Sequence, residues 1–110
     1  MDIKFWRTPA GRSPVEDFLK GVSQAVRADF FDAVSLLVAG EVLAMPLSRN
    51  LSGIKPGLHE LRFKDRAGIY RFFYFVKKAD AIYFVHAITK KTQTLPTADT
   101  ELIRVRLKGL

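Results

Sequence analysis

The chain has 110 residues, 48% of them hydrophobic and 26% charged, which is typical of one globular domain and excludes a disordered or collagen-like chain. The absence of cysteine excludes disulfides, iron–sulfur clusters and thiol catalysis. Because the chain has two histidines, we expect no metal site, and we expect no other cofactor. Eighteen Lys and Arg against eleven Asp and Glu give a net charge of +7, which favours a nucleic acid, an anionic membrane surface or an acidic protein as partner, unless it only serves solubility.

Charges interrupt every long apolar stretch, so the sequence predicts no membrane-spanning helix. Its first residues, Met1 to Arg7, are too few and too charged for a signal peptide. We therefore expect a cytoplasmic protein.

The first half of the sequence predicts one strand and two helices. Residues 3–6 are apolar and aromatic, as in a strand. A helix should begin after Ser13, which can cap it, with Pro14 in its first turn. Apolar residues at helical spacing predict a second helix over 23–39, ended by Gly40. The two helices should form a hairpin that packs on a sheet.

The second half predicts a sheet and a last helix. Residues 41–57, rich in Pro, Gly, Ser and Asn, are expected to form a long loop. Three β-prone runs separated by short turns predict an antiparallel meander, at 58–64, 69–76 and 81–88. A helix should begin near Thr97. The order β-α-α-β-β-β-α predicts a single α+β domain over residues 1–110.

Polar side chains stand inside the predicted meander, where a purely structural sheet does not favour them. Glu60, Arg62 and Lys64 share one phase of their strand and so one face of the sheet. Arg71 lies in mid-strand among aromatic residues, where an arginine is costly unless it is paired or solvated. A structural ion pair between Arg71 and Glu60 is one explanation, and binding of an anion is the other.

More candidates follow on the third strand of the meander. His86 is in phase with Lys90, and Lys91 comes next. Cations beside a carboxylate suit a phosphodiester, because arginine binds phosphate as a fork and a lysine crowded by cations loses its proton more easily. RNA cleavage of this kind needs no metal, since the 2′-hydroxyl is the internal nucleophile. His86 could equally be a satisfied, half-buried histidine.

Other residues are candidates for contact with RNA. Tyr74 could stack on a base, although a core role fits an aromatic strand equally well. Arg49 and Lys55 lie in the predicted loop, as basic contacts or as solvated charges.

Three segments, Leu58–Arg62, Gly68–Tyr74 and His86–Gln93 followed by Pro96, resemble the phage-derived HigB-type toxins of the RelE/ParE superfamily. The predicted order of elements is also that of the superfamily. The resemblance implies the toxin of a type II toxin–antitoxin system, a ribosome-dependent mRNA endonuclease held in check by a helix-turn-helix, HigA-like antitoxin.

The resemblance also implies roles for the basic residues. Arg71 matches the arginine that holds the scissile phosphate, and Lys90 and Lys91 match a further basic catalytic position. Arg62 and Lys64 match positions for substrate binding or proton transfer. Glu60 and His86 fit an acid–base or orienting role, whereas the C-terminal tyrosine of RelE has no counterpart, because no tyrosine follows Tyr83.

Two other functions fit the same resemblance. One is a ParE-like protein that inhibits DNA gyrase and cuts nothing, and the other is an inactive phage-derived accessory module. We expect Arg71→Ala to abolish endonuclease toxicity while leaving the fold intact.

Overall fold

Two serine side chains set the beginnings of the first two helices. In the computed structural model, which describes residues 1–78, 81–90 and 94–110, Ser13 Oγ accepts a hydrogen bond from the Glu16 N–H at 3.3 Å. Ser23 Oγ accepts one from the Val26 N–H at 3.2 Å. Each bond satisfies a main-chain donor that a helix leaves unpaired in its first turn. The helices α1 (Pro14–Gly21) and α2 (Gln24–Val38) begin where the sequence predicts.

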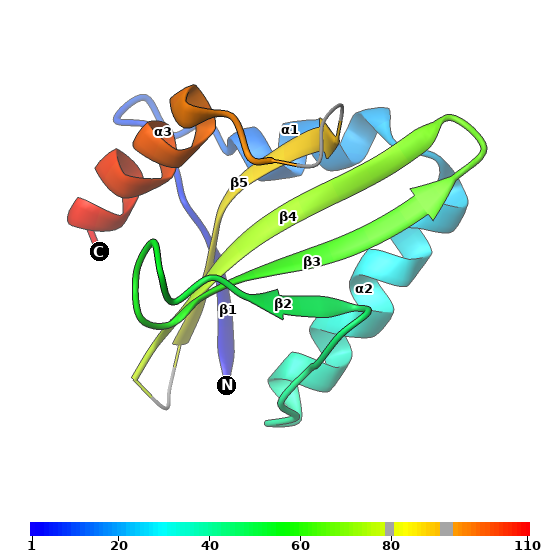
Figure 1. Cartoon of the computed structure of the whole chain (residues 1–110), viewed down its shortest axis with the longest axis horizontal. Helices are drawn as coiled ribbons and strands as arrows, with labels where there is room; N and C mark the ends of the chain where they lie inside the picture. The colour runs from blue at the N-terminus through cyan, green and yellow to red at the C-terminus, as the bar shows by residue number, and fades with distance from the viewer. Residues whose placement is uncertain (79–80, 91–93) are drawn as a thin grey trace.

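The strands of the described residues form one five-stranded sheet in the order β1-β5-β4-β3-β2 (Figure 1). They are β1 (Asp2–Phe5), β2 (Ser48–Asn50), β3 (Leu58–Asp65), β4 (Gly68–Lys77) and β5 (Ala81–Lys90). Strands β2 to β5 pair antiparallel, and β1 joins β5 in parallel. The α+β class and the meander are confirmed. The expected loop over 41–57 is wrong at Ser48–Asn50, which pairs with β3.

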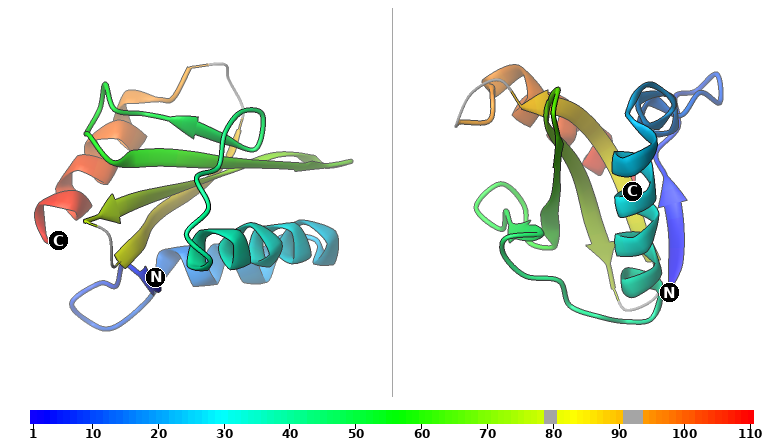
Figure 2. Two further views of the ribbon diagram at one scale, coloured as in Figure 1. Left: turned by 90° about the horizontal axis from the view of Figure 1, so that it is seen from below. Right: turned by 90° about the vertical axis from the view of Figure 1, so that its right-hand side faces the viewer.

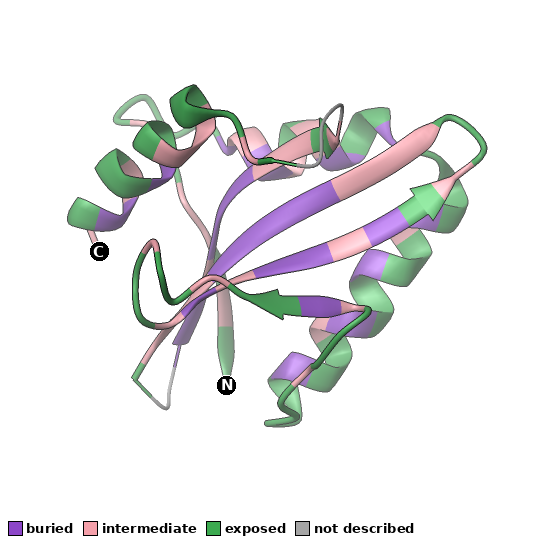
Figure 3. Ribbon diagram, in the orientation of Figure 1, coloured by how far each residue is buried: buried purple, intermediate pink, exposed green. Residues whose placement is uncertain are grey.

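The helices cover both faces of this sheet (Figure 2), and the middle of β4 is buried between them (Figure 3). On one face α1 and α2 enclose a core in which the ring of Phe30 meets the rings of Phe72 and Phe84 at centroid distances of 4.7 and 5.0 Å. On the other face α3 (Thr97–Lys108) packs Ile103 and Leu107 on the sheet. We call these the α2 face and the α3 face.

A β-bulge changes the face of the sheet on which the side chains of the second half of β5 lie. Phe73 pairs with His86 and Tyr74 pairs with Phe84, so Val85 is an extra residue in β5. Phe84 packs in the core on the α2 face, whereas Val85 packs on the α3 face and His86 stacks on Phe73. The bulge lies before His86, and from His86 on the strand alternates regularly, so His86 shares the α3 face with Lys90, as the alternation predicts.

Candidate functional site

Basic side chains gather on the part of the α3 face that lies beyond α3. Arg62 and Lys64 alternate with Leu61 and Phe63, which are buried on the α2 face, so both cations lie on the α3 face. Across the sheet Arg62 pairs with Arg71, and the next row runs from Lys64 through Ile69 to Lys90. Arg49 of β2 pairs with Glu60 at the edge. We call this set the basic face: Arg49, Arg62, Lys64, Arg71 and Lys90.

Arg71 and Glu60 form a buried ion pair in the floor of the basic face. The Arg71 side chain is 4% exposed and that of Glu60 is fully buried. Arg71 donates from Nε to Oε2 of Glu60, and from Nη2 to Oε1 at 3.2 Å, a two-point fork. The guanidinium also lies 5.5 Å from the centroid of the Phe73 ring. The two residues therefore neutralise each other, and the charge that reaches solvent comes from other side chains.

Lys90 is the cation whose proton affinity the site changes. Burial lowers its pKa, and the charges of Arg62, Arg71 and Arg49 lower it further, while Glu60 opposes them. Three arginines on three different strands thus act on one amine. An amine with a lowered pKa gives up and takes back a proton more readily near neutral pH.

His86 ties β5 to the last helix. It is 8% exposed, and its Nε2–H donates to Oδ1 of Asp99 at 2.8 Å, while Nδ1 accepts from Nη1 of Arg106 at 3.4 Å. Burial lowers the pKa of His86, and Arg106 adds to this, against the opposing effect of Asp99. The same Nη1 donates to the Val85 carbonyl at 2.7 Å, and the guanidinium lies 4.4 Å from the centroid of the Trp6 ring. His86 is thus a satisfied, buried histidine on the side of the site where α3 begins.

Asp99 and Arg106 are contacts that sequence reasoning missed. Asp99 lies in the first turn of the last helix, and nothing in its spacing in the sequence indicates that it reaches β5. Asp99 also lines a cleft together with Arg71 and Ile88, so the start of α3 forms one wall beside the buried ion pair.

Tyr74 corrects one prediction. Its side chain lies in the core on the α2 face, 2% exposed, with its hydroxyl 2.7 Å from Oγ of Ser48 and its ring stacked on His59. Arg71 and Tyr74 are three residues apart on one strand, which places them on opposite faces. The expectation that Tyr74 binds RNA is therefore wrong, because no face of its ring is open to a base.

The structure separates the other predicted RNA contacts. Arg49 joins the basic face, as described above. Lys55 instead lines a hollow with the α3 residues Arg104 and Lys108. Lys91 lies outside the described residues, and its predicted catalytic role stays a prediction.

Residues 1–78, 81–90 and 94–110 contain neither a cluster of metal ligands nor a membrane-spanning helix. No group of three or more His, Cys, Asp or Glu side chains is placed there to hold a metal ion. Of the helices in these ranges, none is both long and apolar enough to cross a membrane.

The family comparison supports the phage-derived origin in the resemblance and does not single out HigB-type toxins. A family model described as Phage derived protein Gp49-like (DUF891) matches residues 17–108, which include the whole basic face and the His86–Asp99 contact. A search of curated proteins gave no match.

Proposed function

The chain belongs to the Gp49-like family of phage-derived proteins, part of the RelE/ParE-like toxin family, and we propose that it is a toxin that cuts mRNA on the ribosome. The partners in this proposal are the ribosome with its mRNA and a helix-turn-helix antitoxin of the HigA type. The observation that carries the proposal is Lys90, an amine with a lowered pKa beside the arginines of the basic face.

The proposed reaction uses the RNA's own 2′-hydroxyl. A base on the protein takes the proton of that hydroxyl, and its oxygen attacks the neighbouring phosphorus while the bond to the 5′-oxygen breaks. The leaving 5′-oxygen takes up a proton, so the products are a 2′,3′-cyclic phosphate and a 5′-hydroxyl. Arg62 and Lys64 hold the phosphate oxygens, where negative charge grows during the reaction. Lys90 carries the proton in one of the two transfers.

Arg71 takes a different role in this proposal from the one that the resemblance implies. Its guanidinium is already bound by Glu60, so it lies under the site as one half of an ion pair rather than as an exposed phosphate ligand. It acts on the reaction through Lys90, whose pKa it helps to lower.

The test is cleavage of a defined mRNA by the purified chain, with and without programmed ribosomes, and mapping of the new 5′ ends. Lys90→Met removes the amine and keeps a side chain of similar length. Lys77→Met is the matched control, since Lys77 lies at the opposite end of β4 from the basic face. Ribosome-dependent cuts in the A-site codon that Lys90→Met loses and Lys77→Met keeps would support the proposal. Cuts that survive in Lys90→Met would contradict the role of Lys90.

One observation favours a second function, inhibition of DNA gyrase without cleavage. The neutralised Glu60–Arg71 pair removes the strongest phosphate ligand from the surface, whereas Arg49, Arg62 and Lys64 still offer charge to a protein bound to DNA. Growth arrest with gyrase-dependent DNA breaks, and no cut mRNA, would favour this function over the first.

A further inference from the structure

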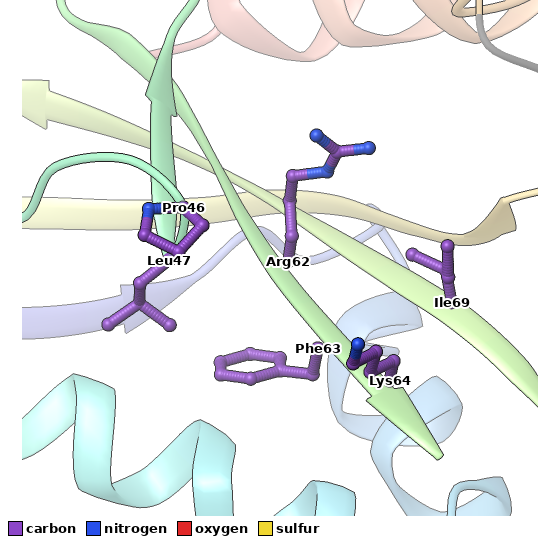
Figure 4. Close-up of a pocket in the computed structure, with 6 residues that line it drawn as sticks. All are labelled: Pro46, Leu47, Arg62, Phe63, Lys64 and Ile69. Atoms are coloured by element: carbon purple, nitrogen blue, oxygen red, sulfur yellow. The ribbon is translucent and has the colours of Figure 1, made fainter. Parts of the chain in front are cut away.

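A slot opens at the edge of the sheet, next to the basic face (Figure 4). The pairing of β2 with β3 ends there: the Arg62 N–H donates to the Leu47 carbonyl at 2.9 Å, and the chain before Leu47 turns, with the Ser48 N–H donating to the Ala44 carbonyl at 3.0 Å. Beyond that bond β3 runs on to Asp65. In the described part of the chain, no strand pairs with this end of β3 on the β2 side.

The walls of the slot are apolar and its rim is basic. In Figure 4 Arg62 and Phe63 extend from β3 to opposite sides, and Pro46 and Leu47 face them from the loop that leads to β2. Ile69 of β4 and Lys64 complete the lining, and none of the described lining residues is a carboxylate. The slot measures about 420 Å³, within the range of about 300–1,000 Å³ of small-ligand pockets.

The open edge also supplies hydrogen-bonding groups. The Arg62 N–H points toward β2, whereas Phe63 pairs with Tyr70 of β4 on the other side. Main-chain groups alternate in direction along an antiparallel strand, so the N–H and C=O of Lys64 point toward the open edge. A donor and an acceptor side by side between apolar walls match the polar edge and the flat faces of a nucleobase.

We propose that this slot holds one base of a single-stranded RNA whose neighbouring phosphate lies on the basic face, an inference that rests on the proposed function. Arg62 belongs to both places, since it lines the slot and pairs across the sheet with Arg71. Lys64 also lines the slot and lies in one row with Lys90. A base is favoured over an added peptide strand because the open edge is only the short stretch from Arg62 to the turn after Asp65.

The test measures binding of an RNA that cannot be cut, so that it does not depend on catalysis. A 2′-O-methyl tetranucleotide and the same backbone with abasic sugars are titrated into the chain at physiological salt. We expect the bases to tighten binding by about 5- to 100-fold, as one stacked base does. Ile69→Ala removes one wall of the slot and should bring this ratio close to one. Ile54→Ala is the matched control, an isoleucine outside the slot and the basic face that lines the hollow beside Lys55.

Changes in the NMR chemical shifts of backbone amides in the unaltered protein give a second measurement, which does not depend on the folding of any variant. The tetranucleotide should move the amide signal of Leu47, which lines the slot and is not part of the basic face, and the abasic backbone should leave this signal in place. Equal affinity for both oligonucleotides, or shifts confined to other surfaces, would overturn the inference. The inference would also be overturned if an acidic peptide displaced the tetranucleotide from the slot and a free base did not. That result would make the slot a peptide site.

The two proposals fail separately. Discrimination between the oligonucleotides without any cut mRNA on ribosomes would keep the slot and refute cleavage. Ribosome-dependent cuts without such discrimination would keep the endonuclease and refute the slot.

Discussion

Removal of Arg71 should destabilise the fold, contrary to the expectation from the sequence that Arg71→Ala leaves it intact. The Glu60 side chain is fully buried and both of its carboxylate oxygens accept from Arg71. Without its partner the carboxylate is left as an uncompensated buried charge, which costs about 3–5 kcal/mol. A domain of this size has a free energy of unfolding of about 5–15 kcal/mol, so much of its stability is lost.

Urea unfolding of four proteins measures this effect: the unaltered chain, Arg71→Met, Glu60→Met and the double variant. Each single variant should lose about 3–5 kcal/mol of unfolding free energy. The double variant should recover most of it, because two methionines of similar length leave no charge in the core. A loss below about 1 kcal/mol in Arg71→Met would refute the reasoning, as it would match a solvated pair. A double variant as unstable as the singles would refute it too.

The same set of variants separates stability from activity. Loss of toxicity in the Arg71→Ala variant alone does not distinguish unfolding of the protein from loss of the cleavage reaction. The folded double variant lacks the ion pair under Lys90 and keeps Arg62 and Lys64. If it is folded and inactive, the Glu60–Arg71 pair matters for the reaction itself.

Three further predictions concern single side chains. Tyr74→Phe removes the hydroxyl that is hydrogen-bonded to Ser48 and should lower the unfolding free energy by about 1 kcal/mol. The affinity for RNA should not change, and a change in a titration would show that Tyr74 contacts RNA. Burial lowers the pKa of His86 in the folded chain, so the unfolded chain binds the proton first and stability should fall as the pH drops below the ordinary value of 6.5. His86→Gln should weaken this pH dependence in urea midpoints, with the similarly shifted His59 supplying the rest, and an unchanged slope would contradict it. Gly57→Ala should cost about 1–3 kcal/mol in the same assay, because φ is +92° and a Cβ would lie 3.0 Å from the Phe75 ring, whereas a neutral result would show that the turn can shift.

Local signals predicted the helices and the meander. Ser13 and Ser23 act within their own first turns, so their spacing in the sequence is enough to place the helix starts. The short strand β2 could not be predicted in this way, because Ser48–Asn50 is a strand only through its pairing with β3. Its composition alone is that of a loop.

The alternation of side chains along the strands predicted part of the site. The limits of this pattern explain the residues that were missed or misplaced. The alternation placed Arg62 with Lys64 and Glu60, and it separates Arg71 from Tyr74. Because both faces of this sheet are covered by helices, hydrophobicity does not show which face is open, and Tyr74 was placed with the RNA contacts. Arg106 reaches β5 from another element, and a contact through space of that kind leaves no trace in the spacing.

The burial of Arg71 shifts the chemistry of the site toward Lys90. A guanidinium whose N–H groups are free binds phosphate strongly, but here Nε and Nη2 of Arg71 already donate to the carboxylate of Glu60. What Arg71 still supplies is a charge that cannot move away, and with Arg62 and Arg49 it acts on the Lys90 amine. A cleaving toxin and a gyrase inhibitor both need positive surface charge, whereas only the cleaving toxin needs an amine whose proton leaves easily. The pKa of Lys90, measured by amine titration, therefore bears on the choice between the two functions more directly than any binding assay. A value at the ordinary lysine pKa of 10.5 would remove the main support for cleavage.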